Sequence, residues 1–337
     1  MSKRLGRQTV KIEDVRIASE ASIVGEKERK GPLGGYFDIV LTDSEWNEKT
    51  WEKTESKMQR EAIRLAAAKA QKKIDDVDRI FSGDLLNQCI GAGFGLRELG
   101  IPFYGLYGAC STMIEGISMA SMLTEGGFVK TAAAAASSHF CTAERQYRTP
   151  LEYGGQRTPN SQWTVTGAAS VITEKGAVKG DIAVSSLTAG KIVDMGIKDT
   201  NNMGGAMAPA AYDTIKAHLF ESKTDPDEYD AIVTGDLGAV GSEILIELLL
   251  KDGIDISKNY KDCGCMIFSK EEQDVHAGGS GCGCIASVLC GYFFNKMRRG
   301  ELKKILAVGT GALLSPTSSL QGESVPGIAH AVAFEIK

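Results

Sequence analysis

The sequence predicts an α/β protein made of two similar halves, residues 1–175 and 176–337. Apolar segments of strand length alternate with segments of helical periodicity, which is typical of strands joined by crossover helices. In addition, the segment Val77–Asp84 (VDRIFSGD) has a near copy in Tyr229–Asp236 (YDAIVTGD), and each copy follows a helical segment. An internal repeat of this kind indicates that the second half repeats the order of elements of the first.

A second correspondence between the halves involves two cysteine-containing helices. When Gly126 is aligned with Gly300, the phasing of helix and strand agrees and Cys110 falls on Cys284. We therefore expect two mostly parallel sheets, buried on both faces, that pack around shared central helices. The predicted central helices are the one that follows Cys110 and the glycine-rich helix at Ser280–Arg298.

Periodicity assigns the individual elements of the first half. The segment 51–73 is a strongly amphipathic helix, with Met58, Ala62 and Ala66 on one face. The other predicted elements are, in chain order, a strand at Val15–Val24, a strand at Val77–Leu86, a short helix at Gly91–Leu99, a buried strand at Ile101–Leu106, a buried strand at Phe128–Ala136, and strands at Ala168–Thr173 and Ile182–Leu187.

Cys110 stands in a stretch of small residues, Gly105–Gly116 (GLYGACSTMIEG), where the predicted strand turns into a helix. A thiol at the start of a helix lies close to free backbone N–H groups and to the positive end of the helix dipole, which favour the thiolate. Cys110 is therefore a candidate for catalysis or ligand binding. The alternative is an inert core cysteine, because free cysteines are among the most buried residues.

The composition is that of an ordinary soluble globular protein. Of 337 residues, 43% are apolar and 24% charged, and 38 basic against 43 acidic side chains leave a formal charge of −5. This charge gives no general attraction to nucleic acids or to anionic membrane surfaces, so neither is an expected partner. We find no apolar run of membrane-spanning length and no secretory signal, and therefore expect synthesis in the cytoplasm.

The eight cysteines are expected to be reduced thiols, since disulfides are rare in the cytosol. The pairs Cys263/Cys265 and Cys282/Cys284 have the spacing C-x-C, which differs from the usual spacing of zinc ligands, so we expect no metal site. His218 is expected on an exposed helix and His330 within the last strand, both in structural roles.

A long polar, aromatic and basic segment at 137–167 interrupts the alternation of strands and helices. Excursions of this length inside compact domains are usually functional or disordered. The arginine and aromatic content favours an ordered, functional segment.

Several strings along the chain resemble the thiolase and ketoacyl-synthase superfamily. GACSTMIEG at 108–116 resembles its nucleophile turn, and HAGGSGCGCI at 276–285 resembles its glycine-rich loop. Longer strings resemble a non-condensing branch, the dipicolinate-binding proteins of the spore SpoVA group; they are GPLGGYFD (31–38), SGDLLNQ (82–88), IPFYGLYGACST (101–112), SSHFCTAERQYR (137–148), AGGSGCGC (277–284) and TGALLSPT (310–317). The resemblance covers nearly the whole chain and implies a thiolase-like, five-layered αβαβα fold of two pseudo-repeated halves.

The resemblance also shows which partners of a catalytic cysteine are present. A condensing enzyme needs polar groups that activate the thiolate and bind the oxyanion and enolate. The first position resembles Thr234-Gly-Asp236, which contains no His or Asn, and a carboxylate there would raise the pKa of the thiol. His276 falls on the second position, and Ala307-Val308-Gly309 replaces the second cysteine of thiolases. We therefore expect a non-catalytic protein with Cys110 as a vestigial nucleophile; an acyl-transferring or condensing enzyme that uses Cys110 is the alternative.

The ligand implied by the resemblance is dipicolinic acid, a planar pyridine with two carboxylates. Arginine side chains and the N–H groups of a helix start suit such an anion. The candidate ligand-binding residues are Cys110, Ser111, His139, Arg145, Arg148, Arg157, Asp236 and Ser280.

Several of these candidates have a structural alternative. The arginines can form salt bridges with Glu144 or Glu152, and His139 can be a structural residue that is hydrogen-bonded at the end of a strand. Asp84 and Asp236 end equivalent strands, where they can cap a helix or stabilise a turn.

The resemblance thus implies a protein that takes part in the uptake of dipicolinic acid, or of its calcium chelate, into the developing spore, with release at germination as a further role. No cofactor is expected. The resemblance implies a homodimer and, as partners, the membrane proteins of the SpoVA group, beside which the chain would lie peripherally at the spore inner membrane. A purely structural scaffold in that assembly is a third interpretation.

Overall fold

Two sheets organise the structure, a computed structural model that describes residues 3–147 and 157–337. The first sheet contains, in spatial order, β5 (Phe103–Gly105), β4 (Arg79–Gly83), β6 (Thr131–Ser138), β8 (Gly167–Lys175) and β2 (Thr9–Val24). The second contains β11 (Tyr260–Asp262), β10 (Ala231–Thr234), β13 (Lys304–Ala312), β14 (Gly327–Ile336) and β9 (Ile182–Thr188). Because β2 and β9 also pair, hydrogen bonds run without a break from one sheet into the other.

Both sheets are mixed, so the prediction of mostly parallel sheets is wrong. β4 runs parallel to β5 and β6, and β10 runs parallel to β11 and β13. The pairs β6–β8, β8–β2, β13–β14 and β14–β9 are antiparallel. A crossover helix returns the chain to the end of the sheet where the previous strand began, so the next strand runs parallel to it. The short α11 (Pro316–Leu320) instead joins β13 to β14 at the end where β13 finishes, so β14 runs antiparallel.

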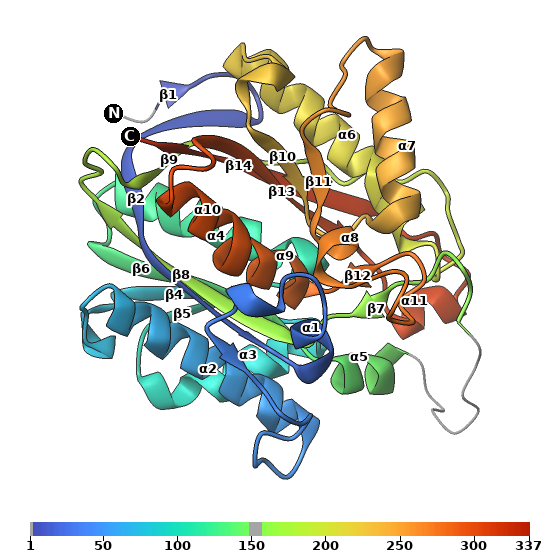
Figure 1. Cartoon of the computed structure of the whole chain (residues 1–337), viewed down its shortest axis with the longest axis horizontal. Helices are drawn as coiled ribbons and strands as arrows, with labels where there is room; N and C mark the ends of the chain where they lie inside the picture. Colours follow the sequence, from blue (N-terminus) through green and yellow to red (C-terminus); the bar gives the residue numbers. More distant parts are fainter. Residues whose placement is uncertain (1–2, 148–156) are drawn as a thin grey trace.

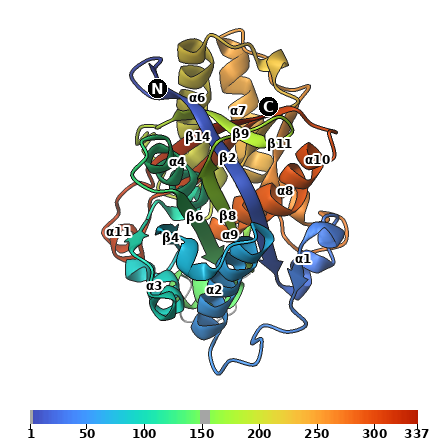
Figure 2. The same ribbon diagram turned by 90° about the vertical axis from the view of Figure 1, so that its left-hand side faces the viewer.

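Helices form the other three layers, which Figures 1 and 2 show from two sides. From one outer layer to the other they are α2 (Trp51–Lys69) and α3 (Ile90–Leu96), then α4 (Thr112–Glu125) and α9 (Cys282–Val288), then α6 (Met203–Ser222) and α7 (Gly238–Lys251). α9 continues through a π-helical turn, Leu289–Phe293, into α10 (Phe294–Arg298). α4 and α9 are the predicted central helices, and the five-layered α/β fold is confirmed.

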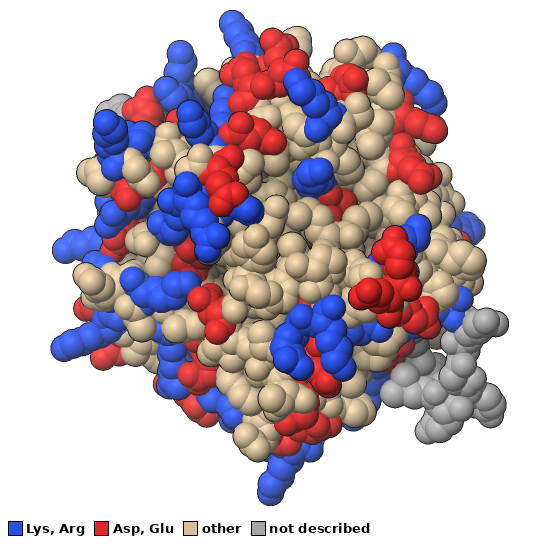
Figure 3. Space-filling model, in the orientation of Figure 1, with Lys and Arg blue, Asp and Glu red and all other residues tan. Residues whose placement is uncertain are grey.

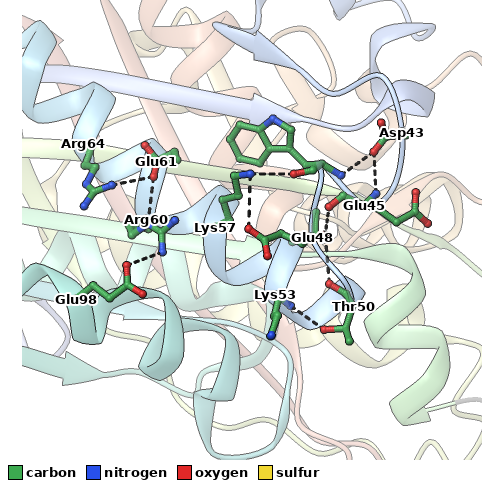
Figure 4. Close-up of polar contacts among 12 residues, drawn as sticks. Asp43, Glu45, Glu48, Thr50, Lys53, Lys57, Arg60, Glu61, Arg64 and Glu98 are labelled. Carbon is green, nitrogen blue, oxygen red and sulfur yellow. Dashed lines mark hydrogen bonds and ion pairs between the residues drawn. The ribbon is translucent and has the colours of Figure 1, made fainter.

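α2 forms where its periodicity predicts it. The Thr50 hydroxyl accepts a hydrogen bond from the Lys53 N–H (3.3 Å) and caps the start of the helix. Its inward face is buried, and its outward face carries contacts such as the ion pair between Arg60 and Glu98 (3.0 Å; Figure 4). The helix ends at Lys69, slightly before the predicted end.

β5 corrects another prediction, because this strand is exposed. Phe103 and Tyr104 keep 37% and 54% of their surface accessible. Within residues 3–147 and 157–337, β5 is the last strand of its sheet and has β4 as its one partner, so its apolar composition does not reflect burial inside the chain.

The segment 137–167 is ordered over its described parts. It contains α5 (Phe140–Tyr147) and β7 (Trp163–Thr164), and β7 pairs in parallel with β12 (Gly279–Ser280). Smaller elements elsewhere are β1 (Lys3–Arg4), α1 (Glu26–Arg29), β3 (Ile39–Val40) and α8 (Cys263–Ile267). Across residues 3–147 and 157–337, no helix combines the length and apolar character needed to span a bilayer. On the face shown in Figure 3, basic and acidic side chains are interspersed.

Candidate ligand-binding site

A cavity of about 750 Å³ lies where the loops after β4, β5 and β13 meet. α5 forms one wall, and the loop Ala312–Leu320, which includes α11, forms another. Cys110 and Ser280 belong to the lining, so two of the predicted site residues share this cavity. The carboxyl ends of strands therefore build the site, as is usual in α/β folds.

Cys110 lies in a 3-10 turn, Ala109–Ser111, directly before α4. Ala109 has a φ of 50°, a conformation that residues with a side chain rarely adopt, and its carbonyl accepts hydrogen bonds from Cys282 Sγ (3.0 Å) and Thr112 Oγ1 (2.6 Å). The N–H groups of Ser111 and Thr112 bond to carbonyls within the turn. The turn therefore offers an anion fewer free N–H groups than the sequence predicts.

Asp236 controls the electrostatics of this turn. It is buried at the end of β10, where its carboxyl accepts hydrogen bonds from Thr310 Oγ1 (2.7 Å), from Gly281 N (3.1 Å) and from the Cys110 thiol. Burial raises the pKa of Asp236 to about 7, against the effect of these donors. Burial, and next the charge of Asp236, raise the pKa of the Cys110 thiol far above its usual value, so Cys110 is a neutral thiol.

Substitution Asp236→Asn is expected to speed the alkylation of Cys110 by iodoacetamide about tenfold at pH 8.5, because it removes the charge that opposes the thiolate. Peptide-level mass spectrometry gives the rate, with the exposed Cys265 as an internal control. An unchanged rate at Cys110 would mean that burial alone keeps the thiol protonated.

The repeat counterpart of Asp236 has a structural role. Asp84 accepts hydrogen bonds from the N–H groups of Leu86 (2.8 Å) and Ala92 (2.7 Å), and so holds the turn that leads into α3. Asp84 is thus a turn and capping residue, the alternative that the sequence left open.

Apart from Glu144, the polar groups of the described lining are uncharged. Among them are Tyr147, an aromatic residue of the segment 137–167 noted in the sequence, and five residues that the sequence did not single out: Asn87, Tyr107, Gln146, Gln162 and Asn201. Gln162 is held in place because its amide N–H groups donate to Asp236 O (2.6 Å) and Gly279 O (3.0 Å). The quoted strings SGDLLNQ and SSHFCTAERQYR contain Asn87, Gln146 and Tyr147, but amides and phenols have no spacing that marks a site.

The predicted arginines have different surroundings. Arg157 bonds to Glu144 (2.7 Å), the one charged residue in the described lining, and its guanidinium also lies 4.7 Å from the ring centre of Trp163. Arg145 turns away to form an ion pair with Glu52 on α2. Arg148 lies outside the described residues.

The remaining candidates do not line the cavity. Ser111 is buried and donates to Gly108 O (2.7 Å). His139 is buried, with Nε2 3.0 Å from Ser44 O and Nδ1 accepting from Cys141 N (3.2 Å), and burial lowers its pKa. His276 lies 3.4 Å from Asp274 and is not among the residues that line the cavity.

The layers and the cysteine turn before a buried central helix define a thiolase-like protein. Among solved structures, an OleA variant from Xanthomonas campestris matches with a TM-score of 0.63 and 15% identity, over 96% of this chain and 99% of that one. 3-Oxoacyl-(acyl carrier protein) synthase III, FabH, from Xanthomonas oryzae matches with a TM-score of 0.60 and 14% identity, over 96% and 99%. At such identities the likeness concerns the fold alone.

The family follows from closer matches. The model of the family Stage V sporulation protein AD (SpoVAD) matches residues 6–335. Stage V sporulation protein AD of Bacillus subtilis (strain 168) is 45% identical over 334 residues, which are 99% of this chain and 98% of that protein. The chain belongs to the SpoVAD family, so it is a sporulation protein with a thiolase-like fold.

Proposed function

We propose that this chain binds dipicolinic acid in the cavity beside Cys110 and takes part in its uptake into the developing spore and its release at germination. The observation that carries the proposal is the Arg157–Glu144 pair. Their side chains keep only 13% and 14% of their surface exposed, and Glu144 faces the cavity. Arg157 thus already holds one carboxylate at the wall, and a carboxylate of the ligand can take the place of Glu144.

The rest of the lining suits the body of such a ligand. Tyr107 and Tyr147 offer flat apolar faces, while the amides of Asn87, Gln146 and Gln162 offer hydrogen-bonding groups. The cavity is larger than the acid itself, so it also has room for the calcium chelate. We propose no other cofactor.

We further propose that the site does not catalyse condensation or acyl transfer. Cys110 is a neutral thiol that hydrogen-bonds to Asp236, and His276 lies away from the cavity. Both features oppose formation of the thiolate nucleophile on which such chemistry depends.

Calorimetric titration with dipicolinate tests this function. Wild type should show saturable binding, Arg157→Ala should weaken it at least about tenfold, and Glu144→Gln should strengthen it severalfold because Arg157 loses its internal carboxylate. Arg60→Ala, which removes the ion pair between Arg60 of α2 and Glu98, neither of which lines the cavity, is the matched control and should bind like wild type.

An absence of heat above dilution in wild type would overturn the proposal. Weaker binding by Glu144→Gln would instead show that Glu144 itself holds the ligand.

The proposal extends to the assembly. β5 is an edge strand with exposed Phe103 and Tyr104, and such an edge suits pairing with the same strand of a second copy to form a homodimer. We propose that this dimer works peripherally at the spore inner membrane, beside the membrane proteins of the SpoVA group.

A further inference from the structure

α5 forms part of the cavity wall, and buried polar groups attach this helix to α2. It contributes Ala143, Glu144, Gln146 and Tyr147 to the lining, and it packs against α2 (Figure 1). On the side facing α2, the Thr142 hydroxyl lies 2.7 Å from Glu55 Oε2. Glu55 is 0% exposed, so this contact joins the wall to the interior of the protein.

The hydroxyl contacts indicate which group carries the proton. Thr142 Oγ1 also lies 2.9 Å from His139 O, and a hydroxyl has one proton for two acceptors. Both contacts are satisfied when Thr142 donates to His139 O and a protonated Glu55 donates to Thr142. At the other oxygen, Ser137 Oγ receives a hydrogen bond from Gln59 Nε2 (3.2 Å) and donates to Glu55 Oε1 (3.1 Å).

The groups around Glu55 favour the same assignment. Asp84, from the end of β4, accepts hydrogen bonds from two backbone N–H groups, which stabilise its carboxylate, whereas the hydrogen-bond partners of Glu55 among the described residues are the hydroxyls of Ser137 and Thr142. The charges of Asp84 and Glu55 both act on the thiol of Cys282 in α9, and Glu52 on α2 is engaged with Arg145. Burial, and next the charge of Asp84, raise the pKa of Glu55 to about 8.

We propose that Glu55 is a pH-sensitive positioning residue of the cavity. When Glu55 loses its proton, α5 is held less firmly against α2 and the affinity of the site for its ligand falls. Ionisation leaves a second carboxylate in the interior, where the charge of Asp84 opposes it, and removes the donor that Thr142 needs for both of its contacts. The statement about ligand affinity depends on the function proposed above, whereas the statement about α5 does not.

Hydrogen exchange of the full chain, measured without ligand, tests whether ionisation of Glu55 weakens the attachment of α5 to α2. Between pH 6.5 and pH 9, after correction for intrinsic exchange rates, wild type should lose about tenfold protection in the peptide that covers α5. Glu55→Gln, whose amide can donate to Thr142 and accept from Ser137, should keep it. Glu61→Gln, on the exposed face of the same helix, should behave like wild type.

Dipicolinate titration over the same range tests the effect on the site, because both ligand carboxyls stay ionised there. Wild-type affinity should fall about tenfold by pH 9, one unit above the pKa of Glu55, and that of Glu55→Gln less than twofold. Asp236 titrates alike in both proteins, so it does not account for the difference.

The outcomes separate the two proposals. Lack of binding at every pH overturns the proposed function and leaves the exchange result to decide the role of Glu55. Protection of α5 that is independent of pH in wild type, or equally dependent in Glu55→Gln, overturns the inference. A pH-dependent α5 with constant ligand affinity overturns the regulation of the site.

Discussion

Substitution Gly83→Ala is expected to destabilise the protein by about 3 kcal/mol or more, whereas the same change at its repeat counterpart Gly235 is expected to cost about 1 kcal/mol. A Cβ atom on Gly83 would lie 1.8 Å from the backbone carbonyl oxygen of Leu106. On Gly235 the nearest atom would be Thr310 Oγ1, at 3.3 Å. The first clash forces the loop after β5 away from β4, next to the cavity, while the second needs only a small side-chain adjustment.

Urea unfolding at pH 7 measures both effects, and an unchanged dependence on denaturant would show that the folded state stays compact. Because the two glycines occupy the same place in VDRIFSGD and YDAIVTGD, Gly235→Ala is the matched control. Similar losses in both variants would contradict the close approach of Leu106 to β4.

Acidification from pH 7 to pH 4 is expected to cost about 3 kcal/mol of unfolding free energy through His218. His218 on α6 is 0% exposed, and its ring nitrogens lie 2.8 Å from Thr188 Oγ1 and 2.7 Å from Tyr229 OH. Burial lowers the pKa of His218 to about 4. Below the ordinary histidine pKa the unfolded chain therefore binds a proton that the folded protein does not, and stability falls as the pH falls towards 4.

The comparison with His218→Phe isolates this effect from the carboxyl groups that titrate in the same range. The variant loses two hydrogen bonds and is less stable at pH 7, but the gap should narrow by about 3 kcal/mol at pH 4. A gap between His218→Phe and wild type that stays constant with pH would contradict a neutral, buried His218.

The fold is shared with OleA and FabH, and the function proposed above gives the site a different task. The thiol turn before the central helix is present, the neutral Cys110 thiol donates a hydrogen bond to Asp236, and the Arg157–Glu144 pair occupies the wall. In the proposed function, the cavity wall beside this thiol receives an anion. Fold and function are separable in this way because the layers position the loops, whereas loop side chains decide the chemistry.

Parts of the site could be predicted from the sequence. Cys110 stands out by its small neighbours, and the repeat together with the superfamily resemblance placed Asp236 beside it, where the structure finds it. Gln146 and Gln162 could not be predicted, because amide side chains have no characteristic spacing in a sequence. Gln146 reaches the cavity through the position of α5, and Gln162 through the pairing of β7 with β12. Arg145 was assigned to the ligand by type alone, and the direction of its side chain towards Glu52 depends on how α5 packs on α2.

The sequence by itself determined where several elements lie: α2 by its apolar face, and the central helices α4 and α9 by the alignment of Cys110 with Cys284. The repeated segments VDRIFSGD and YDAIVTGD predict the two halves. These features are local or repeated patterns, and such patterns indicate which side of an element is apolar. Tertiary structure alone decided which other element, or solvent, each side contacts. β5 is apolar yet exposed, His218 belongs to a helix predicted to be exposed yet is buried, and two equivalent glycines differ because only Gly83 lies against another backbone. The physical reason is that burial and close approach depend on the neighbouring element, and that neighbour is distant in the chain.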